Sequence, residues 1–156
     1  GNMMEDEQRE QIRELREHHI GRLLLQAQRS FNGEAIRKLR ERGYAGLGSS
    51  HVAILPHVDL EGTRISTLAE RAGMSKQAAG QIVDDLERQG LVTRTPDPVD
   101  RRASLIAFTA AGWAYLDAAH AVKQELEAEY RDLLGDDGFD GLKSALSRLI
   151  DHQLPS

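Results

Sequence analysis

Residues 64–109 read RISTLAERAGMSKQAAGQIVDDLERQGLVTRTPDPVDRRASLIAFT and decide the fold. Ile65, Leu68 and Ala69 have the three-and-four spacing of one helix face, and Gly73 is placed to end that helix. Ser75 is placed to cap a second helix. The apolar residues of the second helix recur at the same spacing: Ala79, Ile82, Val83 and Leu86. We therefore predict a helix-turn-helix, a motif whose second helix typically enters a DNA major groove.

The segment after Gly90 predicts a β-hairpin. Residues 91–95 and 102–108 are short and partly β-branched, and they flank a loop that contains two prolines and two aspartates. A hairpin directly after a recognition helix is a wing. The predicted fold class is therefore mainly α with a small β-hairpin wing, a winged helix-turn-helix over residues 46–109.

Further helices precede this motif. Residues 5–30 predict one long helix whose narrow apolar stripe needs a partner helix. Residues 31–33 predict a break, followed by a short helix that closes at Gly43. A further helix over residues 50–60 is expected to be irregular because it contains Pro56.

Two more helices follow the wing. Thr109 is placed to cap a long helix that reaches about Leu134 and is broken by residues 135–138. The last helix starts at Phe139 and continues to about His152. The apolar stripes of the first and last helices are left without partners, so we expect them to pack together across a two-fold axis.

The expected organisation is a single domain over residues 1–156. Within it, residues 5–32 and 112–153 are predicted to form the helices of a homodimer interface.

The composition excludes several kinds of chemistry. The 156 residues include no cysteine, which excludes disulfides, thiolate metal sites and cysteine nucleophiles. The net charge of −5 argues against a protein that coats nucleic acid through bulk electrostatics. No apolar run is long enough for a membrane span and the charged N-terminus does not resemble a secretory signal, so we expect a cytoplasmic protein.

The six histidines do not predict a metal or catalytic site. His18 and His19 are adjacent, so on a helix they point about 100° apart. His51 and His57 also diverge. No zinc-protease motif, glycine-rich phosphate loop or nucleophilic triad is recognisable. We therefore expect no catalytic residue, no metal and no cofactor.

Five blocks of the sequence form a recognisable series: residues 68–70 (LAE), 74–77 (MSKQ), 83–87 (VDDLE) with 90–92 (GLV), 97–103 (DPVDRRA) and 108–112 (FTAAG). In their order and spacing, these blocks resemble the MarR family of bacterial transcriptional regulators. The resemblance implies a homodimer that presents two winged helices to a pseudo-palindromic operator, and in many relatives small aromatic or anionic compounds release the DNA. Phe108 stands where the family usually has leucine, and the absence of cysteine excludes cysteine-based peroxide sensing.

The predicted DNA contacts lie on the second helix and the wing. Glutamine can pair with adenine in the major groove, so Gln77 and Gln81 are assigned to base contact. Small residues at Ala78 and Gly80 allow close approach, and Ser75 and Lys76 are placed to position a phosphate. Asp84 and Asp85 would repel phosphate, which confines the groove contact to the first two turns.

In the wing, Arg101 is predicted to enter a narrow minor groove. Asp100 and Arg102 are predicted to pair and to shape the wing. Arg94 is a further candidate phosphate contact.

A candidate ligand pocket between the dimer helices and the winged domain is assigned to His19, Arg22, His51 and Leu55. Imidazole and cationic groups among apolar walls would suit an aromatic carboxylate.

The combined hypothesis is a homodimeric, sequence-specific regulator of double-stranded DNA, a repressor released by a small ligand. Two alternatives stay open. One is a winged-helix module that binds proteins and not DNA, and the other is an enzyme that uses its histidines as acid-base groups.

Overall fold

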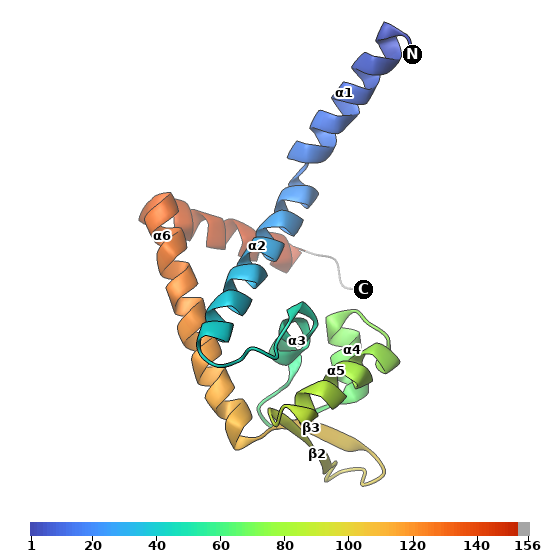
Figure 1. Ribbon diagram of the computed structural model, residues 1–156, viewed down its shortest axis with the longest axis vertical. Helices are drawn as coiled ribbons and strands as arrows, with labels where there is room; N and C mark the ends of the chain where they lie inside the picture. Colours follow the sequence, from blue (N-terminus) through green and yellow to red (C-terminus); the bar gives the residue numbers. More distant parts are fainter. Residues whose placement is uncertain (153–156) are drawn as a thin grey trace.

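The computed structural model describes residues 1–152 of the chain. Figure 1 shows short helices and strands gathered at one end of the molecule, while the long helices extend away from them. The elements are α1 (Met3–His18), α2 (Ile20–Glu41), α3 (Ser49–Ile54), η1 (Leu55–His57), β1 (Thr63–Arg64), α4 (Ile65–Ala72), α5 (Lys76–Arg88), β2 (Val92–Pro96), β3 (Ser104–Phe108) and α6 (Ala110–His152). The predicted fold class, mainly helical with a small wing, is confirmed.

The N-terminal helical region is divided at His19. This residue has extended backbone angles, φ −67° and ψ 139°, and its Nδ1 accepts a hydrogen bond from the Gly21 N–H at 3.1 Å. His19 thereby caps α2 and separates it from α1. The prediction of one helix over residues 5–30 is therefore wrong, because a side-chain cap replaces the helical conformation at this residue.

The predicted break at residues 31–33 is also wrong, since α2 continues through Gly33. The flanking side chains explain the continuity. The Phe31 ring lies edge-on to the Tyr130 ring at 6.1 Å between centroids, and Ala35 is buried. This packing outweighs the cost of a glycine inside a helix, which is about 1 kcal/mol.

The irregularity expected at Pro56 is confirmed. The α-helix α3 ends at Ile54, and η1 continues as a single turn of 3-10 helix that contains the proline. Ile54 and Leu55 are both buried, so the turn is anchored in the core although its conformation changes.

The helix-turn-helix and wing form as predicted, with one addition. Strands β2 and β3 pair antiparallel from Val92 opposite Phe108 to Pro96 opposite Ser104. A third strand, β1, pairs with the other edge of β3, which gives the sheet order β1, β3, β2. Strand β1 was not predicted, because a strand of two residues has no periodicity of its own.

The last helix, α6, begins after Thr109, whose Oγ1 accepts the Gly112 N–H at 3.0 Å as the predicted cap. The break predicted for residues 135–138 is confined to Gly135, where φ is 77° and ψ is 162°. Residues 110–134 and 136–152 therefore form two helical arms that meet directly. Residue 153, the predicted end of the dimerisation helix, lies outside the described residues.

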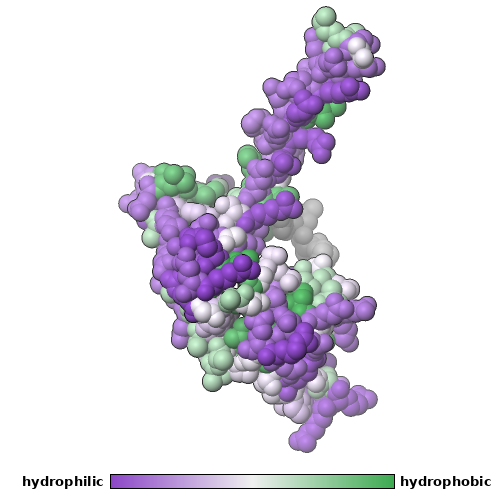
Figure 2. Space-filling model, in the orientation of Figure 1, coloured by the Kyte–Doolittle hydropathy of each residue, from purple (hydrophilic) through white to green (hydrophobic). Residues whose placement is uncertain are grey.

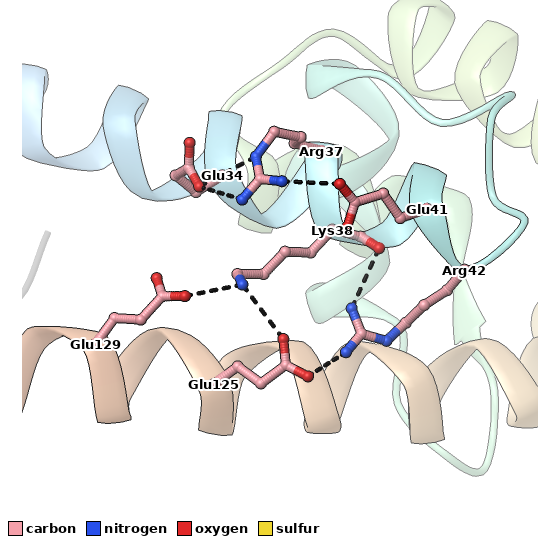
Figure 3. A network of polar contacts seen from close by, with 7 residues as sticks. All are labelled: Glu34, Arg37, Lys38, Glu41, Arg42, Glu125 and Glu129. Carbon is pink, nitrogen blue, oxygen red and sulfur yellow. Dashed lines mark hydrogen bonds and ion pairs between the residues drawn. The ribbon is translucent and has the colours of Figure 1, made fainter.

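A polar network joins α2 to the first arm of α6 (Figure 3). Lys38 is buried, and its Nζ lies 3.3 Å from a Glu125 oxygen and 2.9 Å from a Glu129 oxygen. Arg42 pairs with the same Glu125. The pKa of Lys38 is raised, mainly by the hydrogen bond to Glu129, so the ammonium stays charged beside its two carboxylates.

The core runs from the C-terminal half of α2 through the winged helix to the first arm of α6. α1 and the second arm of α6 contribute little to this core. No residue of α1 is buried, and Phe139 is the one buried residue within residues 136–152. Figure 2 shows one face on which α1 is largely hydrophilic with isolated hydrophobic side chains. Large apolar side chains of these helices are exposed, namely Ile12, Leu15, Ile20, Leu23, Leu142, Leu149 and Ile150.

Candidate nucleic-acid interface

The turn between α4 and α5 fixes the position of the second helix. Gly73 closes α4 in the left-handed conformation, with φ 66° and ψ 35°. Ser75 then begins α5, and its Oγ accepts the Ala78 N–H at 3.0 Å. Both local predictions are confirmed. Together they direct the N-terminal end of α5, with its unsatisfied N–H groups and positive dipole end, toward solvent.

The two faces of α5 differ as predicted. Ala79, Val83 and Leu86 are fully buried against the rest of the winged helix. The candidate contact residues at the opposite face and the cap are exposed: Ser75, Lys76, Gln77 and Gln81. Gln77 and Gln81 are four residues apart and therefore share one side of the helix.

Ala78 and Gly80, the two small residues predicted to allow close approach to DNA, are half-buried. At Gly80, an added Cβ would have the Ile65 side chain as its nearest neighbour, at 3.9 Å. The missing side chain of Gly80 therefore faces α4, and its direct contribution is to the packing of the two helices.

The acidic second half of α5 is engaged within the chain. Asp84 pairs with Arg94 of β2, and Glu87 lies 3.5 Å from the same guanidinium. Arg94, the candidate phosphate contact, therefore connects the wing to the recognition helix.

Asp85 faces α3. It pairs with His51, whose other ring nitrogen, Nδ1, accepts the Gly48 N–H at 2.9 Å. With Nδ1 accepting, the ring proton is on Nε2 and points to Asp85. The pKa of Asp85 is lowered, first by this bond to His51 and then by Gln89. His51 therefore caps α3 and positions α5 at the same time.

A buried carboxylate organises the wing. Asp97 follows β2, and its Oδ1 accepts the Val99 N–H at 2.8 Å while its Oδ2 accepts the Arg64 Nε–H at 2.8 Å. The pKa of Asp97 is lowered, first by the Val99 N–H and then by Arg64. The pair between Arg64 and Asp97 was not predicted, although an aspartate between two prolines is a typical turn-forming residue.

The loop between β2 and β3 carries the remaining candidate residues. The predicted pair is present: Asp100 Oδ1 accepts the Arg102 backbone N–H at 3.1 Å and lies 3.2 Å from the Arg102 Nε. Arg101 is exposed beside it. The wing loop and α5 lie at the same end of the molecule, far from α1 (Figure 1).

Comparison with known proteins identifies this winged helix. The sequence profile of the MarR family matches residues 45–103, from the loop before α3 to the wing. Over these residues the chain resembles the MarR family of transcriptional regulators. A comparison with curated proteins finds no match.

Solved structures of MarR-family proteins and other regulators resemble the chain over most of its length. CouR from Rhodococcus jostii RHA1 bound to p-coumaroyl-CoA is 27% identical, with 89% of this chain and 96% of that chain covered and a TM-score of 0.68. The transcriptional repressor CouR bound to a 23-mer DNA duplex is 25% identical, with coverage of 87% and 95% and a TM-score of 0.70. Wild-type apo MarR from E. coli is 22% identical, with coverage of 83% and 96% and a TM-score of 0.70, which shows the fold alone.

The four candidate pocket residues do not line one cavity. His19 caps α2 at an exposed bend, and Arg22 lies beside the arginines of α1. His51 is engaged with Asp85, and Leu55 is part of the core. Residues chosen from separate helices by sequence alone have no defined direction relative to one another, which is why the structure separates them.

A different cavity, of about 520 Å³, lies between α2, the α3–η1 segment, α4 and α6. Phe31 and Tyr115 supply aromatic walls, and Arg71 and Lys123 supply two cations. Burial, followed by the neighbouring Tyr44, raises the pKa of Tyr115 to about 12, so its phenol is neutral. Among the residues that line this cavity, none is acidic.

Within residues 1–152, no cluster of His, Asp and Glu has the arrangement of a metal site. No helix in this part of the chain has the length and hydrophobicity needed to cross a bilayer.

Proposed function

We propose that this chain is a sequence-specific, double-stranded DNA-binding transcriptional regulator that acts as a homodimeric repressor. One observation carries the proposal: Gln77, Gln81 and Arg101 are exposed, and the two elements that carry them, α5 and the wing loop, lie at the same end of the molecule (Figure 1). In this arrangement Gln77 and Gln81 read base edges in the major groove, and Arg101 enters the adjacent minor groove.

The other candidate residues position Gln77, Gln81 and Arg101 relative to the DNA. Ser75 and Lys76, at the N-terminal end of α5, bind a phosphate oxygen. Arg94 acts through its pairs with Asp84 and Glu87, which fix the wing relative to α5. The Asp100–Arg102 pair shapes the loop that presents Arg101.

The homodimer is supported by the exposed apolar side chains of α1, α2 and the second arm of α6. Such a set of exposed apolar side chains, outside the core of the chain, needs a partner surface. A two-fold dimer places two α5 helices in successive major grooves, about 34–36 Å apart. CouR, which is 25% identical, has been solved on a 23-mer duplex and is described as a transcriptional repressor.

Ligand response is assigned to the cavity between α2 and α4 in place of the four residues predicted from sequence. Its aromatic walls and the cations Arg71 and Lys123 suit an aromatic or acyl compound that carries a negative charge. Arg71 also donates to the His57 carbonyl at 2.8 Å and to Asp59 at 3.0 Å. A ligand anion that competes for Arg71 would favour a different position of α4 and thereby lower the affinity for DNA.

Selection of bound sequences from a random duplex library tests the function. We expect one pseudo-palindromic site to be enriched at low salt. Arg101→Ala should weaken binding to that site and reduce the salt slope by about one. Arg40→Ala, which removes an exposed arginine from α2 outside the predicted dimer helices, is the matched control and should change neither quantity.

Base reading has its own test. Gln77→Ala should relax the preference at one operator position by about 1–3 kcal/mol. Gln124→Ala, an exposed glutamine on α6, should leave the preference unchanged. Retention of no duplex by the parent protein would contradict the proposal and favour a protein-binding winged helix.

A further inference from the structure

The kink in α6 has a conformation that only glycine adopts readily. At Gly135 the backbone has φ 77° and ψ 162°, a region that is closed to side chains with a Cβ. An added Cβ would meet no other atom within 4 Å, so the restriction comes from the backbone and not from crowding. The sharp bend between the two arms of α6 therefore depends on this residue.

Side chains from both arms close over the bend. Arg131, in the first arm, pairs with two carboxylates of the second arm, Asp136 at 3.2 Å and Asp140 at 3.1 Å. The Arg131 guanidinium carbon also lies 4.6 Å from the centre of the Phe139 ring. Phe139 is only 3% exposed, and within residues 136–152 it is the one buried residue.

Lys143 completes this arrangement. Its Nζ lies 5.6 Å from the centre of the same ring and 3.5 Å from a carboxylate oxygen of Glu127 in the first arm. Two cations of different arms thus contact one aromatic ring, and each also pairs with a carboxylate across the bend. We call Arg131, Phe139 and Lys143 the hinge clamp.

The first arm packs closely against the winged helix and is paired with α2. Gly112 packs directly against the Leu91 carbonyl, and Lys38 of α2 is paired with two glutamates of the same arm. The second arm instead presents Leu142, Leu149 and Ile150 to solvent. The angle at Gly135 therefore determines where a winged helix lies relative to the surface that the second copy would cover.

The length of the first arm amplifies small changes in this angle. Residues 110–134 form a helix about 37 Å long, so a rotation of about 10° moves its far end by about 6 Å. This distance corresponds to roughly two base-pair steps of DNA, which rise about 3.4 Å each. Discrimination between operators that differ by one or two base pairs in spacing thus requires the angle to be held firmly.

We propose that the hinge clamp fixes the angle between the arms of α6 and so determines which half-site spacing the dimer accepts. Arg131, Phe139 and Lys143 are positioning residues in this proposal, since they act through the helix and do not contact DNA. The proposal rests on the proposed function, because it requires a dimer that binds two half-sites.

Distance measurement within one chain tests the clamp without DNA. The chain has no cysteine, so Ala114→Cys and Ser147→Cys place one spin label on each arm. Double electron–electron resonance on labelled protein diluted with unlabelled protein then reports the distance between the arms. We expect one narrow distribution for the parent, a broader one for Arg131→Gln and Phe139→Leu, and a longer distance for Gly135→Ala, in which the arms straighten.

Arg37→Gln is the matched control for Arg131→Gln. Arg37 also pairs with two carboxylates, Glu34 and Glu41, but all three residues belong to α2. This variant should keep the parent distribution. If Arg131→Gln and Phe139→Leu both keep it as well, the clamp does not hold the angle and the proposal is wrong.

The closing experiment measures spacing preference on duplexes that carry the same two half-sites with different numbers of base pairs between them. The parent should prefer one spacing by about tenfold over its neighbours, and Arg131→Gln should reduce this preference to about threefold or less, with similar affinity for the best duplex. Restoration of the charge by Arg131→Lys should recover part of the preference.

The outcomes are distinguishable. Parent protein that binds no duplex at all contradicts the proposed function and, with it, the role of the clamp. Parent protein that prefers one spacing, with the same preference in Arg131→Gln and Phe139→Leu, contradicts the clamp alone.

Discussion

In the winged helix, Leu68, Val83 and Leu86 are completely buried, whereas Leu15, Leu149 and Ile150 of the outer helices are more than half exposed. Both sets have the spacing of an amphipathic helix. The first set packs within one chain because α3, α4, α5 and the sheet surround it. The second set has no such surroundings. The spacing of apolar residues therefore identifies a helix face that must be buried. It does not show whether the same chain or a second copy buries that face.

The largest effect is expected in the core of the winged helix. Leu86→Ala should lower the free energy of unfolding by about 3 kcal/mol, because it removes a fully buried side chain and leaves a cavity. Chemical denaturation followed by circular dichroism measures this change. If the free energy of unfolding falls by less than about 1 kcal/mol, the winged helix does not depend on its own core in the way this comparison requires.

The second-largest effect on stability is expected where α6 packs against the winged helix. Gly112→Ala should lower the free energy of unfolding by about 2–3 kcal/mol, since the new Cβ would lie 2.1 Å from the Leu91 carbonyl oxygen. Gly33→Ala is the matched control. Its Cβ would meet no atom within 4 Å inside α2, so it should stabilise the protein by about 0.5–1 kcal/mol in the same denaturation experiment.

The exposed side chains of the second arm should affect association more than folding. Leu149→Ser should change the free energy of unfolding of the monomer by less than about 0.5 kcal/mol, because Leu149 is 55% exposed. The dimer dissociation constant should rise by about tenfold or more, since the substitution is present in both copies. Sedimentation equilibrium measures this constant, and Ser147→Ala on the same arm is the control. An unchanged constant would place the dimer interface elsewhere.

The smallest effect is expected within the wing and depends on pH. Because the pKa of Asp97 is lowered in the folded chain, its contribution to stability is complete above the unfolded pKa of about 3.9. This contribution is lost as the pH falls through the folded pKa. Asp97→Asn should therefore flatten the loss of thermal stability between about pH 5 and pH 2.

Thermal unfolding followed at several pH values tests the role of Asp97. Asp117→Asn, in which the replaced carboxylate is exposed on α6, should retain the parent profile. Identical profiles for Asp97→Asn and the parent would show that the bond to Arg64 does not stabilise the wing.

The candidate interface shows how far sequence reasoning reaches. Ser75 as a cap, the two faces of α5 and the Asp100–Arg102 pair were predicted, and each depends on residues within a few positions of one another. The pairs Arg64–Asp97 and Arg94–Asp84 were missed, because their partners are separated by many residues and meet only when the sheet forms. The roles of Gln77, Gln81 and Arg101 toward DNA stay predictions.

The sequence by itself determined the helix-turn-helix and the wing. Apolar spacing, the Ser75 cap, the glycine at position 73 and the proline-rich loop act through bonds between neighbouring residues, so they can be recognised without a fold. Only the tertiary structure decided that α2 continues through Gly33, that Thr63 and Arg64 add a third strand, and that a cavity forms beside Arg71. These features depend on contacts between distant segments, whose energies outweigh local preferences and cannot be assigned until the chain has folded.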